Sequence, residues 1–158
     1  MAFIVRSMIK DDAPACAAIA CASEIGERYG FRPDALADTF MAALDAGGQL
    51  FVAEREGTVA GFAWIDPRGA FSSAPYLRLI AVDASIRGSG VGSALLEEFE
   101  ARTASVGRDW CLLVSDFNNK AQAFYERHGY RKAGALPDFA RAGITEILMV
   151  KKHGEKMT

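Results

Sequence analysis

The sequence predicts one α/β domain, of the α+β type, in which a central mixed and mostly antiparallel sheet carries helices on both faces. Length and segment order predict this class. The chain has 158 residues, and domains commonly span ~100–200 residues, so residues 1–158 are expected to form a single domain. Short apolar runs of strand type and longer runs of helical periodicity follow one another in the order βααβββαβαββ.

Cap and turn residues set the limits of the expected helices. Asp12 stands before Pro14, a combination typical of a helix start with aspartate as the cap and proline in the first turn. Pro33 begins another helix, and Gly47 ends it. We expect helices over residues 11–23, 33–45, 91–106 and 118–128, with a loop or broken helix over 24–32.

The expected strands are short apolar segments bounded by turn residues. Glu56-Gly57 between two of them predicts a hairpin, and Trp110 to Val114 is a continuous apolar run typical of a buried strand. Residues 67–74 are rich in glycine and serine and predict a loop. We expect strands over residues 3–6, 50–54, 59–65, 76–82, 110–114, 130–135 and 144–150.

Composition excludes several classes of function. Lysine and arginine number 18 against 20 aspartates and glutamates, a net charge of −2, so the chain lacks the basic face of a general nucleic-acid binder. No apolar stretch approaches the ~20 residues of a membrane span, and no secretory leader is visible, so a cytoplasmic protein is expected. The 3 cysteines and 2 histidines show no zinc spacing and predict no metal site.

A glycine-rich turn, Arg87-Gly88-Ser89-Gly90-Val91-Gly92-Ser93, lies between an expected strand and an expected helix. Glycines let a backbone approach a ligand closely, and the unpaired amides that begin a helix attract anions, so the turn suits a phosphate, with Arg87 at its rim. A tight connection with a glycine cap explains the pattern equally well. A P-loop would need lysine where Ser93 stands, and the dinucleotide fingerprint would need glycine there.

Two blocks resemble the GNAT superfamily of N-acetyltransferases. Leu79 to Val82, the turn, and the Ala-Leu-Leu that follows resemble its central acyl-CoA motif, Arg/Gln-x-x-Gly-x-Gly/Ala, which Arg87, Gly90 and Gly92 fill. Asn118 to Tyr130 resembles the family's Asn-x-x-Ala-x-x-x-Tyr segment with its closing Gly-Phe, with Tyr130 replacing the phenylalanine. The resemblance spans essentially the whole chain. It implies the GNAT fold, a sheet that splays at its parallel pair.

The resemblance implies acetyl-CoA as the cosubstrate. Its pyrophosphate is expected on the amides of the turn, and its pantetheine arm beside the backbone of the preceding strand. The Asn118 carboxamide would bond this arm, Ala121 would give it room, and Tyr125 would be the catalytic acid that protonates the leaving thiolate. The expected cofactor-binding residues are Ile80, Ala81, Val82, Arg87, Gly88, Ser89, Gly90, Val91, Gly92, Ser93, Asn118 and Ala121.

The implied reaction is direct acetyl transfer to the primary amine of a small molecule or a peptide. Its proton acceptor is unassigned: Glu24, Glu27 and Asp116 are candidates, each typical of a solvated surface carboxylate. By analogy, residues 24–32 and 136–141 border the acceptor site. Their aromatic and arginine side chains suit an aromatic or carboxylate-bearing amine, although ordinary loops have the same composition.

Two other functions stay open at this point. One is a catalytically silent acyl-CoA-binding or sensor module, which the lack of a carboxylate in the strand before the turn leaves possible. The other is a nucleotide-binding domain, which the missing P-loop lysine disfavours. Dimerisation is common in the family that the chain resembles, so a homodimer is among the expectations.

Overall fold

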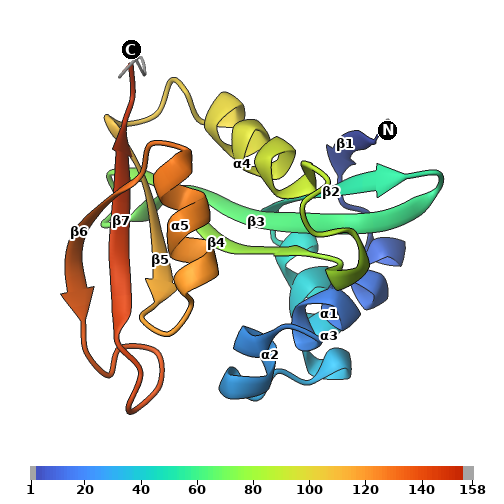
Figure 1. Cartoon of the computed structure of the whole chain (residues 1–158). Coiled ribbons are helices and arrows are strands. Elements are labelled where there is room, and N and C mark those ends of the chain that lie inside the picture. Colours follow the sequence, from blue (N-terminus) through green and yellow to red (C-terminus); the bar gives the residue numbers. More distant parts are fainter. Residues whose placement is uncertain (1–2, 155–158) are drawn as a thin grey trace. The chain divides into compact units, whose positions relative to one another are not determined.

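The computed structural model describes residues 3–154, which form a seven-stranded sheet with helices (Figure 1). The strand order is β1-β2-β3-β4-β5-β7-β6. β4 and β5 run parallel through the pairs Tyr76–Cys111 and Leu77–Leu112. The pairs β1–β2, β2–β3, β5–β7 and β6–β7 are antiparallel. A mixed and mostly antiparallel sheet confirms the predicted fold class.

The strands are β1 (Ile4–Ser7), β2 (Gln49–Arg55), β3 (Thr58–Ala70), β4 (Ala74–Val82), β5 (Asp109–Ser115), β6 (Arg131–Leu136) and β7 (Glu146–Lys152). The α-helices are α1 (Ala13–Cys21), α2 (Glu24–Tyr29), α3 (Pro33–Asp45), α4 (Val91–Arg102) and α5 (Asn119–Arg127). Two short 3-10 helices, η1 (Lys10–Asp12) and η2 (Ala84–Ile86), complete the order. Across the described residues, no helix has the length and apolar character needed to cross a lipid bilayer.

The segment expected as a loop or broken helix contains a short helix, α2, so three helices rather than two separate β1 from β2. Ser23 begins it, because its Oγ accepts a hydrogen bond from the Gly26 amide at 3.0 Å. Gly30 ends it in the left-handed conformation, with a φ of 70°. A side chain at Gly26 would collide with the Ala20 carbonyl oxygen, so this glycine permits close packing of α2 against α1.

The predicted loop over residues 67–74 is wrong, because β3 continues to Ala70 and β4 begins at Ala74. The chain reverses over three residues only. Phe71 and Ser72 adopt left-handed φ values of 55° and 58°, and the Ser73 amide donates to the Ala70 carbonyl at 3.0 Å. A tight turn of this kind leaves the neighbouring residues free to pair as strand.

Two helix ends also differ from the prediction. α4 ends before Thr103, whose hydroxyl accepts a hydrogen bond from Trp110 Nε1 at 2.9 Å and so belongs to the packing of β5. Asp12 stands at the N-terminus of α1 but does not cap it. Its carboxylate accepts from the Ile9 amide at 2.8 Å and from Arg6 Nη1 at 2.8 Å, which ties β1 to η1 instead.

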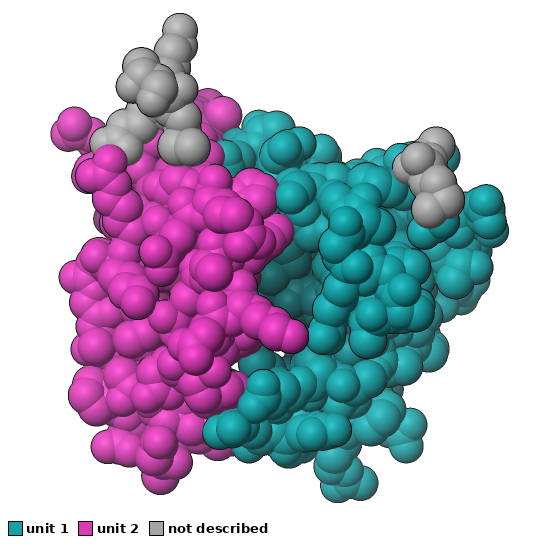
Figure 2. Space-filling model, viewed as in Figure 1, with its two compact units in different colours: residues 1–65, 79–102 teal, residues 66–78, 103–158 magenta. Residues whose placement is uncertain are grey.

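The chain divides into two compact units, shown in teal and magenta in Figure 2. Unit 1 comprises residues 1–65 and 79–102, and unit 2 comprises residues 66–78 and 103–158. β3 and β4 therefore each pass from one unit into the other. Unit 1 holds α1 to α4, whereas unit 2 holds α5.

In unit 1, helices cover both faces of β2 and β3. Val52 and Phe62 are register partners and join Phe40 of α3 in a buried core, where the Phe40 and Phe62 ring centroids lie 5.1 Å apart. Side chains alternate along a strand, so Phe51 points to the other face. There the Arg102 guanidinium of α4 lies 4.5 Å from the Phe51 ring centroid. α4 is thus held opposite α1 and α3.

In unit 2, α5 packs on one face of the sheet, beside β5 (Figure 1). Trp110 and Lys151 are register partners and share a face. Lys151 Nζ lies 5.5 Å from the Trp110 ring centroid and 5.8 Å from that of Tyr130. Tyr130 packs on Tyr125 of α5 with ring centroids 5.9 Å apart. The helix therefore lies on the Trp110 face, where Leu112 is 1% exposed.

Gly61 of β3 should tolerate no larger residue. A Cβ there would lie 2.9 Å from the Ala81 carbonyl oxygen, 3.1 Å from Val91 Cγ1 and 3.2 Å from Leu95 Cδ1. We predict that Gly61→Val lowers the free energy of unfolding in urea by about 1–3 kcal/mol, because it overpacks this junction. Gly134→Val on β6 is the matched control, since no atom lies within 4 Å of its Cβ position. Equal losses in both variants would contradict the prediction.

Candidate functional site

The predicted phosphate turn follows η2 in unit 1 and has the conformation that its glycines permit. The Asp83 carboxylate accepts from the Ser85 amide at 2.9 Å and from the Ser85 hydroxyl at 2.8 Å, which begins η2. Gly88 and Gly90 have φ values of 86° and 92°, and a Cβ at either position would meet no atom within 4 Å. Backbone conformation rather than lack of space therefore demands glycine here, and the surface above both residues is open.

α4 begins directly after the turn. The first hydrogen bond of the helix runs from the Ala94 amide to the Gly90 carbonyl at 3.0 Å. The amides of Val91 and Gly92 thus belong to the first turn, where a helix offers no acceptor and carries partial positive charge, and Val91 is only 1% exposed. The Ser89 amide already donates to Ile86 at 3.2 Å, so Ser89 offers a ligand its hydroxyl rather than its amide. The exposed Arg87 adds a full positive charge.

The strand segment Ile80–Val82, predicted to pair with pantetheine, also lies in unit 1. Its residues are half-buried. Just beyond it, the Asp83 amide donates to the Ala60 carbonyl at 2.9 Å, which ties the end of β4 to β3. This strand end leads through η2 directly into the glycine turn.

The second predicted block lies in unit 2, where Asn118 is the cap of α5. Its Oδ1 accepts a hydrogen bond from the Ala121 amide at 3.1 Å. The carbonyl half of the carboxamide is therefore committed to the helix, and the NH₂ half is what Asn118 can offer a ligand. Ala121 is half-buried and small, as a close approach to a cofactor requires.

Tyr125 is buried on α5, with 6% of its surface exposed. Its ring packs edge-on against Phe124 and Tyr130, with centroids 5.4 Å and 5.9 Å away. Burial, and to a smaller extent the Tyr76 hydroxyl, raises the pKa of Tyr125 well above its usual range. The phenol therefore keeps its proton at neutral pH and can serve as a hydrogen-bond or proton donor.

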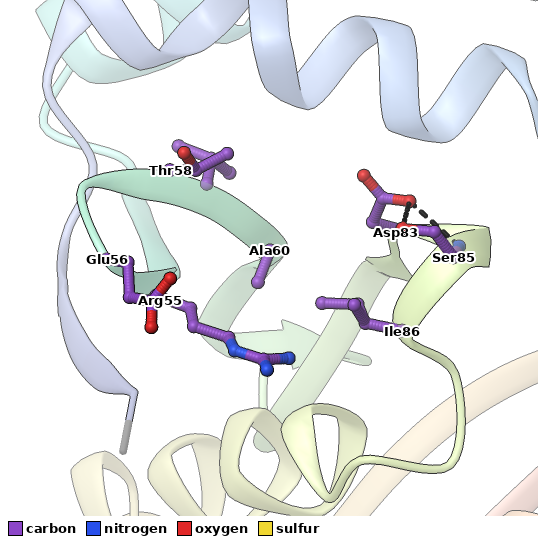
Figure 3. A pocket seen from close by; sticks show the side chains of 8 residues that line it. Arg55, Glu56, Thr58, Ala60, Asp83, Ser85 and Ile86 are labelled. Atoms are coloured by element: carbon purple, nitrogen blue, oxygen red, sulfur yellow. Dashed lines mark hydrogen bonds between the residues drawn. The ribbon is translucent and has the colours of Figure 1, made fainter. Parts of the chain in front are cut away.

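A pocket of about 340 Å³ opens in unit 1 beside the start of the turn (Figure 3). The β2–β3 hairpin forms one wall and η2 the other, and the Arg55 side chain extends toward Ile86. It is lined by Arg55, Glu56, Thr58, Val59, Ala60, Asp83, Ser85 and Ile86. The glycine turn begins just after this lining, at Arg87, so the pocket adjoins the turn without containing it.

Sequence reasoning missed a group of buried polar residues in unit 2. Gln122 Nε2 donates to the carbonyls of Ser115 at 3.0 Å and of Asp116 at 3.1 Å, which fixes α5 to the end of β5. Ser115 and Glu146, register partners on β5 and β7, are only 2% and 5% exposed. Nothing in the local sequence marks them, because the register that joins them is set by the fold.

The carboxylates considered earlier as proton acceptors are exposed. Glu24 Oε1 pairs with Arg28 Nη2 at 3.0 Å on the surface of α2, and Glu27 and Asp116 are exposed as well. Among the described residues, no three His, Cys, Asp or Glu side chains gather as a metal site would require. The predicted site residues thus fall into two groups, Ile80–Ser93 in unit 1 and Asn118–Tyr125 in unit 2.

Comparison with known proteins identifies the family of this chain. Residues 46–132 match the family described as Acetyltransferase (GNAT) domain. Blasticidin-S acetyltransferase of Streptomyces morookaense is 39% identical over 77 residues, which cover 49% of this chain and 56% of that protein. The chain therefore spans little more than half the length of this relative.

Solved structures share the fold. A GNAT-family protein of Desulfovibrio desulfuricans superimposes with a TM-score of 0.79 at 25% identity, covering 97% of this chain and 100% of that one. YncA of Salmonella typhimurium, solved with its cofactor acetyl-CoA, gives a TM-score of 0.72 at 19% identity over 100% of this chain and 98% of its own.

The buried phenol predicts how stability depends on alkaline pH. Because folding raises the pKa of Tyr125 above its unfolded value near ~10, the folded state holds this proton more tightly. Its contribution is fully present below pH ~10 and is lost as pH rises through the folded pKa. We expect the unfolding free energy of the wild type to fall more steeply between pH ~9.5 and 11 than that of Tyr125→Phe, in urea titrations at each pH. Parallel curves would contradict the burial of an ionisable phenol here.

Proposed function

Because this chain belongs to the GNAT acetyltransferase family, we propose that it transfers an acetyl group from acetyl-CoA to the primary amine of a small molecule or a peptide. The observation that carries the proposal is the turn after η2, where two glycines with positive φ lie below open space and directly precede the N-terminus of a helix, which carries partial positive charge. A diphosphate has the charge and size that such a turn accepts.

Within this proposal, residues of unit 1 hold the cosubstrate. The amides of Val91 and Gly92 donate to the diphosphate, Ser93 borders it, and Arg87 neutralises part of its charge. The backbone of Ile80–Val82 offers its peptide groups to the amides of the pantetheine arm, in the manner of an added strand. Acetyl-CoA itself supplies the activated acyl group as a thioester.

Residues of unit 2 are proposed to serve the leaving group. Tyr125 donates its proton to the sulfur as the C–S bond breaks, a role for which the raised pKa keeps the phenol protonated. The NH₂ group of Asn118 and the small side chain of Ala121 are proposed to border the pantetheine arm. A backbone amide near Ala81 or Val82 would stabilise the oxyanion that forms at the carbonyl.

The acceptor is proposed to be a small amine. The relative from Streptomyces morookaense is named for the acetylation of blasticidin S, which is a small molecule. An alkylamine with a pKa near ~10.4 is mostly protonated at pH 7, so the reaction also needs a proton acceptor.

Gly90→Glu tests the turn. The substitution places a negative charge in the proposed diphosphate site, and like charges brought together cost several kcal/mol, so we expect the affinity for CoA to fall about 100-fold or more in calorimetry. Gly47→Glu is the control, because Gly47 also has a positive φ, of 82°, and open space at its Cβ position but lies after α3. Unchanged CoA binding by Gly90→Glu would rule out this turn as the diphosphate site.

Tyr125→Phe tests the acid. Removing the phenolic proton should lower kcat about 100-fold while the KM for acetyl-CoA stays within a factor of ~2, because the hydroxyl acts in the transition state. The assay measures thiol release from acetyl-CoA with a panel of amines. Tyr130→Phe, which also removes one hydroxyl from a buried ring, should retain activity. If Tyr125→Phe is as active as the wild type, the phenol is not the acid.

A further inference from the structure

The sheet of unit 2 has a second face, opposite the one that α5 covers. Side chains alternate along β5, so Leu113 and Ser115 point away from the face of Leu112. Leu113 and its register partner Leu148 are half-buried, whereas Leu112 and its partner Met149 are only 1% and 0% exposed. This second face is therefore partly exposed at Leu113 and Leu148 but buried at Cys111, Ser115 and Glu146.

Four side chains with exchangeable protons share the second face. Tyr76 of β4 is the register partner of Cys111 on β5. Cys111 and Ser115 point to the same face because they are four residues apart on one strand. Ser115 is in turn the register partner of Glu146 on β7. Glu146 is only 5% exposed although its side chain is ionisable. Burying a carboxylate is costly unless polar or charged groups interact with it, so the groups that share its face matter.

Electrostatic interactions connect these groups to the proposed acid. Burial has the largest effect on the pKa of Tyr76 and raises it. The charge of Arg78 lowers this pKa, and the charge of Glu146 raises it. Tyr76 in turn helps to raise the pKa of Tyr125. Tyr76 thus lies within electrostatic range both of the phenol assigned to the thiolate and of the buried carboxylate. The titratable and charged side chains that register and alternation place on this face are Tyr76, Arg78, Asp109, Cys111, Arg131, Glu146 and Lys152.

We propose that Glu146 is the catalytic proton acceptor, which deprotonates the ammonium form of the acceptor on the second face of the unit 2 sheet, beside Tyr76. This inference rests on the acetyl transfer proposed above. It supplies the one role that the sequence left unassigned, and it places the proton acceptor on the opposite face of the sheet from α5, which carries the proton donor.

The proton balance is as follows. The ammonium gives one proton to Glu146, and the free amine then uses its lone pair to form the C–N bond. The C–S bond breaks with its electron pair on sulfur, which takes the proton of Tyr125. The nitrogen loses its second proton, and through water this proton restores the phenol. The proton on Glu146 passes to water, so each amide formed releases one proton in net.

Glu146→Gln tests the proposal, because it keeps the shape of the side chain and removes its ability to accept a proton. The readouts are kcat/KM from pH 6.5 to 10.5 with blasticidin S, benzylamine and an alanyl dipeptide, and the Kd for CoA by calorimetry. We expect kcat/KM at pH 7 to fall ~100-fold or more, as loss of a general base does, with the deficit shrinking toward pH ~10, where the amine is already neutral. The Kd for CoA should stay within a factor of ~2.

Glu126→Gln is the matched control. Glu126 lies on α5, its side chain is 54% exposed, and its Oε1 is 4.0 Å from Lys132 Nζ, so its loss should leave the pH profile unchanged. If Glu146→Gln does not fold, Glu146→Asp takes its place. Aspartate keeps the carboxylate but has a side chain one methylene group shorter, so the carboxylate lies farther from the amine. The kcat should therefore fall ~5-fold or more with an unchanged KM for acetyl-CoA. Wild-type kcat in Glu146→Asp would overturn the proposal.

The outcomes separate this inference from the proposed function. If the wild type transfers acetyl groups and Glu146→Gln does so equally well at pH 7, or with a deficit that does not change with pH, Glu146 is not the proton acceptor and the acetyltransferase stands. If the wild type binds no CoA, or binds it and transfers the acetyl group to none of the three amines, the proposed function fails and this inference fails with it.

Discussion

The backbone conformation at Gly88 and Gly90 is the constraint on which the functional account depends. With φ values of 86° and 92°, these residues turn the chain from η2 into α4, and a Cβ at either position would lie in open space directly before the first helical turn. An L-amino acid with a side chain rarely adopts this conformation, so the proposed anion site depends on the absence of two Cβ atoms. Gly61 is a second requirement of this region, because only a glycine there lets β3 pack against the end of β4 and against α4.

The proposed chemistry uses two kinds of environment in different parts of the chain. The turn in unit 1 is exposed and holds its ligand through backbone amides and Arg87, an arrangement that recognises charge and needs no burial. The groups of unit 2 that would move protons are more enclosed. Burial keeps the Tyr125 phenol protonated, whereas Glu146 contributes a carboxylate to the other face of the same sheet. The entering nitrogen and the leaving sulfur are bonded to the same carbon during the transfer, so the proposed base and acid both act on that one centre, and Tyr76 interacts with both of them.

Sequence patterns predicted those features that neighbouring residues determine. The helix from Pro33 to Asp45 has the bounds expected from its proline and the glycines after it, and the glycine turn lies where its motif placed it. The loop expected over residues 67–74 was wrong, because a composition rich in glycine and serine does not show that a turn closes within three residues. Glu146 could not be found in this way, since its partner Ser115 is distant in the sequence and only the β5–β7 register brings them together. Asn118 was identified, but not its cap on α5, which occupies half of its carboxamide.

Amide chemical shifts test the central claim most directly. In ¹⁵N-labelled protein titrated with CoA, the backbone resonances of Val91, Gly92 and Ser93 should shift strongly and saturate together, since these are the amides that begin α4. Saturable binding of CoA that leaves these three resonances in place would show that the diphosphate lies elsewhere, and would contradict the account.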